Sequence, residues 1–132
     1  MLDLPFNHTV SIVIITVIIS LIAFSNQNVM NRLIFWPPAM QKGQYDRFIT
    51  HGFIHADGTH LLFNMITLFF FGSVIESFYR QYFYELGFVL FYLGGLIVAI
   101  IPSYLKHKND HRWASLGASG AVSAVLFAYI LF

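Results

Sequence analysis

The sequence predicts an all-α, polytopic membrane helix bundle, and two observations carry this prediction. Hydrophobic residues make up 58% of the 132 residues and charged residues only 10%, with a mean hydropathy of +0.69. Soluble domains carry about 25% charged residues, so this chain has too little polar surface to cover a globule in water. Long uncharged apolar runs also recur along the chain. In a bilayer the backbone of such a run must satisfy its own hydrogen bonds, which favours a helix.

The composition also excludes several kinds of function. The formal net charge is +1 and no basic patch stands out, so we expect no binding of nucleic acid. The chain has no cysteine, which excludes disulfides and thiolate metal sites, and we expect neither a metal nor a cofactor. Asp3 and the lack of Lys or Arg before the first apolar run indicate a retained membrane helix rather than a cleaved signal peptide.

We expect four membrane helices, at about residues 6–24, 60–79, 85–104 and 116–132. The first contains the uncharged run VSIVIITVIISLIAF, which is long enough with the residues before it to cross the hydrocarbon core. Gly72 in the second and Gly94 and Gly95 in the third allow close helix contacts, and Pro102 lies near the end of the third. The fourth stops soon after Ser119, so we expect the chain to be cut within or at the end of this helix.

Residues 25–59 form a long connection that we expect to be an interfacial loop. It carries polar residues, but also the apolar run from Leu33 to Trp36. A free loop in water would not carry so many large apolar residues, so we expect the segment to pack on the membrane interface or dip into it. Trp36 and Tyr45 have the amphipathic rings that suit this position.

A histidine and an asparagine share one face of the second expected span. His60 and Asn64 are four residues apart, which on a helix places them one above the other. Polar side chains in a membrane helix must find partners within the protein. The pattern fits two roles: an interhelical hydrogen bond that holds the bundle, or a pair of donors directed at a developing oxyanion.

A serine between two glycines opens the last expected span, in Gly117-Ala118-Ser119-Gly120. Small residues continue along this helix, so one interpretation is a smooth face for helix packing. The other is a nucleophile, because Gly117 and Gly120 leave room for a substrate and a helix N-terminus favours an oxyanion. A catalytic serine needs an adjacent base, and no histidine follows Ser119 in the chain.

Other polar groups border the spans. His51 and His55 have helical spacing, but the stretch HGFIH lacks the glutamate of a zinc protease. Structural histidines bonded to backbone carbonyls are therefore favoured over a zinc site. Arg47 and Glu76 lie beside membrane segments, where a charged group either anchors a helix at the interface or braces a loop or helix end through buried hydrogen bonds.

Taken together, these motifs resemble the rhomboid family of intramembrane serine proteases. Their order, their spacing and their placement on the spans agree with that family over the part of the chain from about residue 47 onward. The residues that carry the resemblance are Arg47, His51-Gly52-Phe53-Ile54-His55-Ala56, His60-Leu61-Leu62-Phe63-Asn64-Met65, Phe71-Gly72 with Glu76, and Gly117-Ala118-Ser119-Gly120.

The resemblance implies a rhomboid-like bundle of six spans, of which about four are present here. It implies that Ser119 is the nucleophile and that His60 and Asn64, with the serine's own backbone N–H, hold the oxyanion. The general base would be a histidine on a sixth span, beyond the C-terminus of this chain. The remaining motif residues would be structural supports: Arg47, His51, His55, Glu76, Gly117 and Gly120.

The resemblance further implies an integral, multi-pass protein of a bacterial inner or plasma membrane. Its partners would be the lipid bilayer and transmembrane protein substrates, cut near their outer ends where small or helix-breaking residues let them unwind. Because the base is missing, we expect the 132 residues alone to be inactive. The alternative is a catalytically inactive relative that binds membrane clients without cutting them. A third interpretation is a small helical scaffold or a transporter subunit, but no buried carboxylate relay or pair of broken helices in the sequence favours it.

Two further features bear on this interpretation. Within the chain, His107 and His111 are the other candidates for a base, in a position that the family does not use. Many relatives also carry an aromatic residue where this chain has Ser123. The family places the long loop and the loop after the third span outside. The positive-inside rule points the other way, because all but one of the Lys and Arg residues lie in those two loops and only Arg80 lies opposite.

Overall fold

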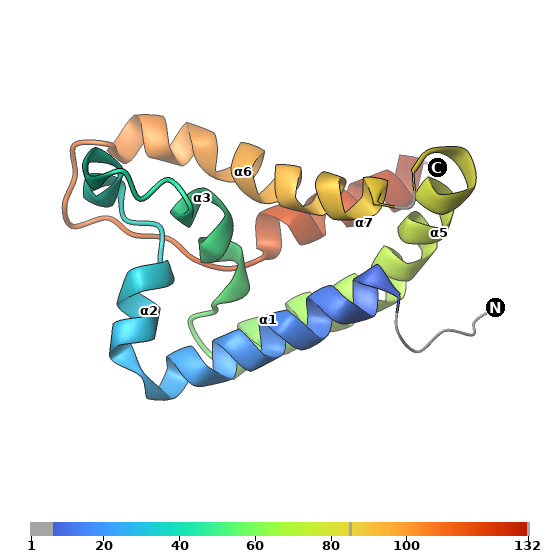
Figure 1. Cartoon of the computed structure of the whole chain (residues 1–132), viewed down its shortest axis with the longest axis horizontal. Coiled ribbons are helices and arrows are strands. Elements are labelled where there is room, and N and C mark those ends of the chain that lie inside the picture. Colours follow the sequence, from blue (N-terminus) through green and yellow to red (C-terminus); the bar gives the residue numbers. More distant parts are fainter. Residues whose placement is uncertain (1–6, 85, 132) are drawn as a thin grey trace.

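The computed structural model describes residues 7–84 and 86–131, and its helices run back and forth in a bundle (Figure 1). Four apolar segments form the bundle: α1 (His8–Ser25), the continuous α4 (Gly58–Thr67), η3 (Leu68–Gly72) and α5 (Ser73–Tyr82), α6 (Gly87–His107), and α7 (Ser119–Leu131). Within the described residues, the first three are long and apolar enough to cross a membrane, whereas α7 is a shorter apolar helix. The predicted all-α membrane bundle is confirmed.

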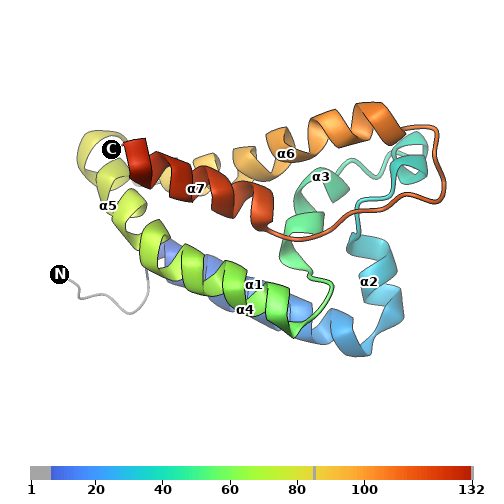
Figure 2. The ribbon, with the colours of Figure 1, turned by 180° about the vertical axis from the view of Figure 1, so that it is seen from behind.

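The four segments form two pairs that are closest at one end (Figures 1 and 2). Helix α1 lies along α4, η3 and α5, and α7 lies between α6 and the η3–α5 turns. Large side chains such as Leu68, Phe88 and Tyr92 fill the space between the pairs and are fully buried. Outward-facing residues such as Phe70 and Leu90 are equally apolar and exposed. An apolar outer surface around an apolar core is the pattern of a bundle that faces lipid.

The connection before α4 is not an open loop but a series of short helices: α2 (Gln27–Leu33), η1 (Pro37–Lys42), α3 (Arg47–Thr50) and η2 (His51–Phe53). Helix α2 can begin because the Asn26 side chain accepts hydrogen bonds from the first N–H groups. The segment is held down by Phe35, which is fully buried and makes edge contacts with Phe48, Tyr104 and Trp113. Phe35 also pairs with Ser115 through two backbone hydrogen bonds of 2.9 and 3.0 Å.

Several helix boundaries differ from the expected ones for local reasons. Helix α4 begins at Gly58 because the Asp57 side chain caps it. Helix α6 continues past Pro102 to His107. Helix α7 begins only at Ser119, because Gly117 has a φ of +112°, outside the helical region.

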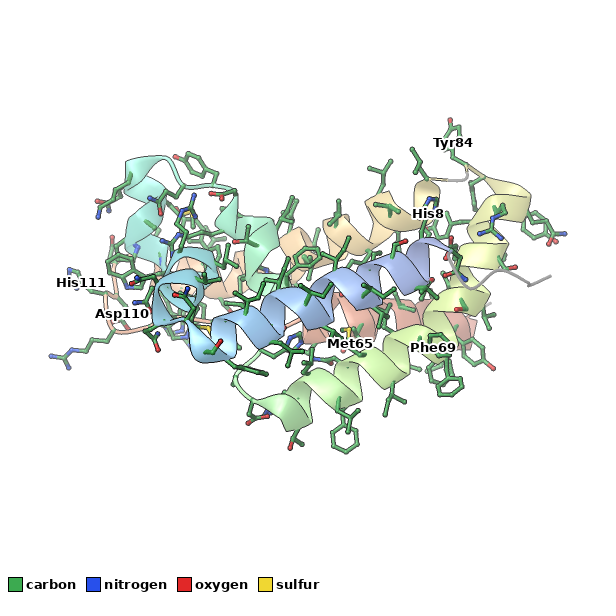
Figure 3. The ribbon with its side chains drawn as sticks, turned by 60° about the horizontal axis from the view of Figure 1, so that its bottom comes forward. His8, Met65, Phe69, Tyr84, Asp110 and His111 are labelled. Atoms are coloured by element: carbon green, nitrogen blue, oxygen red, sulfur yellow. The ribbon has the colours of Figure 1, made fainter. Side chains whose placement is uncertain are left out.

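Glu76 caps the start of α1 from the neighbouring α5 helix. Its side chain is 1% exposed, and its carboxylate accepts bonds from Thr9 N–H at 2.8 Å, Thr9 Oγ1 at 2.7 Å and His8 N–H at 2.9 Å. Arg80 donates to the same carboxylate at 3.0 Å. A negative charge at the N-terminus of α1 satisfies N–H groups that have no partner within the helix. This contact lies at the His8 end of the bundle, opposite Asp110 and His111 (Figure 3).

Replacing Glu76 by Ala should strongly destabilise the bundle. The first N–H groups of α1 would be left buried without an acceptor, at a cost of about 2–4 kcal/mol. Thermal unfolding in detergent micelles would measure the loss. Asp46→Ala is the matched control, because its pair with Arg32 is about half exposed and should contribute at most about 1 kcal/mol. Equal, small effects of both changes would contradict the cap.

Candidate active site

Ser119 is the first residue of α7, and its side chain lines two small cavities of about 160 Å³ each. Around the first cavity lie residues of α4, of the turn before it and of the chain that leads into α7: His55, Ala56, His60, Asn64, Leu116, Gly117 and Ser119. The fold therefore brings together the serine, the histidine and the asparagine that the motifs single out. His60 and Asn64 come from one face of α4, and Ser119 comes from the end of α7 nearest to it.

The segment from His51 to His55 fixes the backbone just before Ser119. The Gly117 N–H donates to the His51 carbonyl at 2.8 Å, and the Ala118 N–H donates to His55 Nε2 at 3.3 Å. At its other ring nitrogen, His55 Nδ1 lies 3.1 Å from Ser20 Oγ. One arrangement satisfies all three groups: the Ser20 hydroxyl donates to the Phe53 carbonyl at 2.9 Å, His55 Nδ1–H donates to Ser20, and Nε2 is left as the acceptor.

The two glycines beside Ser119 are needed for different reasons. Gly117 has a φ of +112°, a conformation that strains any residue with a Cβ. Gly120 faces α6, and a Cβ built on it would collide with the Ala99 side chain. Because glycine has no Cβ, the start of α7 can lie directly against α6. The serine therefore lies at a sharp bend that is closed in by a neighbouring helix.

His60 is held by the residue that caps its own helix. Asp57 Oδ1 accepts from the His60 N–H at 2.9 Å and lies 2.8 Å from His60 Nδ1. Both side chains are largely exposed, at 56% for Asp57 and 69% for His60. Asn64 lies one turn further along α4 and is half-buried.

The second cavity lies between α6 and the chain that leads into α7. Polar groups line it, among them His51, Ser103, Ser115 and Ser119. His51 Nε2 donates to the Leu96 carbonyl of α6 at 3.2 Å. A polar cavity of this size can hold water, and this one opens directly beside the serine.

Comparison with known proteins shows the family of the chain. Residues 42–132, more than half of the chain, match the sequence profile of the rhomboid domain. The chain belongs to the rhomboid family. It is 31% identical over 126 residues to the rhomboid protease GlpG of Enterobacter sp. (strain 638), an alignment that covers 92% of this chain and 41% of that protein.

Two further rhomboid relatives match over shorter stretches. YdcA of Bacillus subtilis (strain 168) is 33% identical over 88 residues, 67% of this chain and 41% of that protein. The RHOMBOID-like protein 12, mitochondrial, of Arabidopsis thaliana is 30% identical over 119 residues, 78% of this chain and 34% of that protein. The aligned regions thus cover about two-fifths or less of the length of these relatives.

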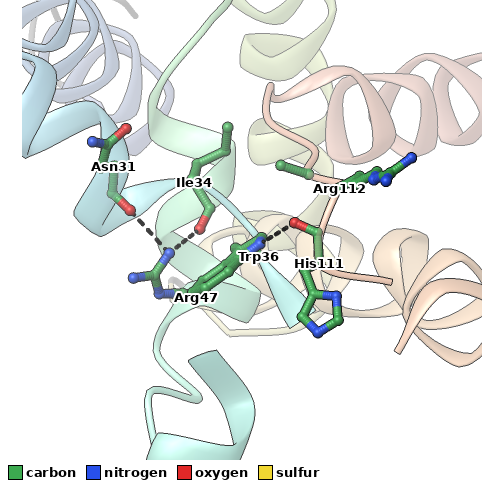
Figure 4. Close-up of a pocket in the computed structure, with 7 residues that line it drawn as sticks. Asn31, Ile34, Trp36, Arg47, His111 and Arg112 are labelled. Atoms are coloured by element: carbon green, nitrogen blue, oxygen red, sulfur yellow. Dashed lines mark hydrogen bonds between the residues drawn. The ribbon is translucent and has the colours of Figure 1, made fainter. Parts of the chain in front are cut away.

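Arg47 lies apart from both cavities, although it belongs to the same rhomboid motifs. Only 6% exposed, it donates through Nη1 to the carbonyls of Asn31 at 3.0 Å and Ile34 at 2.7 Å (Figure 4). Nearby, the Trp36 indole donates to the His111 carbonyl at 2.9 Å. Arg47 therefore ties α2 to α3, and the Trp36 bond joins this segment to the loop that follows α6. Glu76 lies still further away, at the opposite end of the bundle.

Neither loop histidine lines a cavity beside Ser119. The His107 ring stacks on Trp113 with ring centroids 4.4 Å apart, and His111 lines a separate pocket of about 490 Å³ with Arg47. In this arrangement they are not placed to act as its base.

Two contacts near the candidate site were missed at the level of sequence. Ser20 of α1 makes a hydrogen bond with His55. The signal for it was present in the sequence, because Thr9, Thr16 and Ser20 form one polar stripe on an otherwise apolar helix, and all three are buried. Asp57 makes a hydrogen bond with His60, three residues further along the chain. The signal for it was the aspartate itself, which is a favoured N-cap residue and accepts from N–H groups of the first turn. We expected both histidines to bond backbone carbonyls. His51 does so, with a carbonyl of α6, whereas His55 Nε2 accepts from a backbone N–H.

The burial of His55 should make the stability of the protein depend on pH. Desolvation, helped by the charge of His60, lowers the pKa of His55 to about 4, and burial also lowers the pKa of His51. In the unfolded chain a histidine titrates near about 6.5. Between these values the unfolded chain binds a proton that the native protein does not, so stability should fall as the pH drops from about 6.5 to about 4.

Thermal unfolding in detergent as a function of pH would measure this effect. His55→Gln removes the titration of one ring, so its melting temperature should fall less steeply over the same window. The remaining slope would come in part from His51. An unchanged slope in the variant would show that His55 is not the group responsible.

Proposed function

We propose that the full-length protein is an intramembrane serine endopeptidase in which Ser119 is the nucleophile and His60 and Asn64 are the oxyanion donors. One observation carries the proposal: these three residues, from two helices far apart in the sequence, line a single cavity. Membership of the rhomboid family supports it, because GlpG of Enterobacter sp. (strain 638) carries the name of a rhomboid protease.

In this proposal the cavity supplies the nucleophile and the oxyanion donors for peptide-bond cleavage. The Ser119 oxygen would attack the scissile carbonyl, and the negative charge would develop on the carbonyl oxygen. Donors fixed in advance around that oxygen contribute most when water is largely excluded. The His60 and Asn64 side chains would be two such donors. The first N–H groups of α7 would add to them, because they have no acceptor within the helix and lie at its Ser119 end. The second cavity would supply the water that completes hydrolysis.

The base in this proposal is a histidine from a segment outside these 132 residues. His51 and His55 already use ring nitrogens in hydrogen bonds that hold the backbone, and the loop histidines lie elsewhere. Ser123 lies one turn after Ser119, and both are exposed on α7. This face is accessible to a further helix, which could bring an imidazole beside the nucleophile.

The substrates in this proposal are transmembrane proteins, cut near their outer ends at small or helix-breaking residues. We place the protein in a bacterial inner membrane, with the connection from α1 to α4 and the loop after α6 on the outer side. The basic residues of that side include Arg47, which is buried and held by hydrogen bonds to backbone carbonyls. These contacts offer a reason why Arg47 need not follow the positive-inside rule.

The rival function is a catalytically inactive rhomboid that binds transmembrane clients. The engagement of His51 and His55 favours it, because these two imidazoles already hold the backbone through hydrogen bonds. The same cavity would then contact a client helix without cutting it.

Labelling with a fluorescent fluorophosphonate separates these functions. The full-length protein in detergent should be labelled, and Ser119→Ala should abolish both the labelling and the cleavage of a fluorogenic single-span peptide. Ser123→Ala is the matched control and should retain both activities, because this exposed serine lies one turn away on the same helix. Labelling that persists in Ser119→Ala would rule out Ser119 as the nucleophile.

Removing either oxyanion donor should slow cleavage without unfolding the protein. His60→Ala and Asn64→Ala should each lower kcat by about 10²- to 10³-fold, since one donor to the oxyanion contributes about that much. Kinetics on the same peptide would measure the loss, with circular dichroism to verify the helical fold. A tenfold rise in KM with an unchanged kcat would instead indicate a role in substrate binding.

A further inference from the structure

One oxygen of Asp57 makes two contacts with His60, which lines the cavity beside Ser119. Asp57 Oδ1 accepts the His60 backbone N–H at 2.9 Å, which caps α4, and it also lies 2.8 Å from the ring nitrogen His60 Nδ1. The first contact starts the helix that carries both expected oxyanion donors. The second fixes the ring of one of them.

The second contact determines which ring nitrogen is left for the cavity. An ionised carboxylate can only accept, so His60 Nδ1 must carry the proton in this bond. Hydrogen bonds from the His60 backbone and ring lower the pKa of Asp57, which keeps the carboxylate charged at neutral pH. His60 Nε2 is then the nitrogen left for an oxyanion. It can donate only from the imidazolium form, because the neutral ring with its proton on Nδ1 carries a lone pair on Nε2.

We propose that Asp57 is a positioning residue, which orients His60 so that Nε2 serves the oxyanion. This inference rests on the proposed function of Ser119 and His60. The Asp57 carboxylate acts on the reaction through His60, in addition to capping α4. Residues that only cap should be replaceable by any good cap, whereas a positioning residue should not.

The two tasks can be separated by substitutions at this one position. Serine caps a helix about as well as aspartate, but its shorter side chain cannot also reach the His60 ring. Asp57→Ser should therefore keep the melting temperature of the full-length protein while lowering kcat about tenfold with little change in KM, less than the 10²- to 10³-fold loss of a whole donor. Asp57→Ala, the comparison variant, should lose both stability and kcat.

A double-substitution cycle tests whether the effect passes through His60. In the His60→Ala background, Asp57→Ser should cause no further loss of kcat on the fluorogenic single-span peptide. Two results would overturn the inference: a kcat for Asp57→Ser equal to that of the unsubstituted protein, or an equal loss in both backgrounds. Ser119→Ala, assayed in parallel, distinguishes a failure of the proposed function from a failure of the role of Asp57. Cleavage that survives Ser119→Ala defeats the proposed function itself, whereas its loss together with a fully active Asp57→Ser defeats only the role of Asp57.

Discussion

Two backbone N–H groups just before Ser119 are bound by the segment from His51 to His55, and the position of the serine depends on them. The His51 carbonyl and the His55 ring accept these bonds from Gly117 and Ala118. Without them the chain leading into α7 would have buried polar groups with no partner, which is costly in a membrane protein. With them, the bend at Gly117 is held and α7 starts beside the face of α4 that carries His60 and Asn64.

The rest of the bundle supports this junction from both ends. At one end Glu76 closes the N-terminus of α1, and at the other Arg47 and Phe35 hold the short helices that lead into the histidine segment. Between the ends the largest buried side chains, such as Leu68 and Phe88, are apolar, and the outer surface is largely apolar too. Because lipid gives no hydrophobic drive for helices to associate, close packing at glycines and these buried polar contacts have a large share in specifying the arrangement.

The sequence predicted some levels of this structure well and others poorly. Composition and apolar runs predicted the helix bundle, since the bilayer leaves a long apolar segment few alternatives. Spacing placed His60 and Asn64 on one face of α4. The helices between α1 and α4 were not predicted, because they depend on tertiary contacts made by Phe35 and Arg47. The bond between Asp57 and His60 was missed because a cap and an imidazole partner look alike in sequence.

An experimental structure of a covalent adduct would show most directly whether Ser119, His60 and Asn64 meet around one oxyanion. The full-length protein would be treated with diisopropyl fluorophosphate and its structure determined. We predict a bond from phosphorus to Ser119 Oγ, with the phosphoryl oxygen within about 3.2 Å of the His60 and Asn64 side chains. An adduct on another residue, or a phosphoryl oxygen that points away from both side chains, would contradict it.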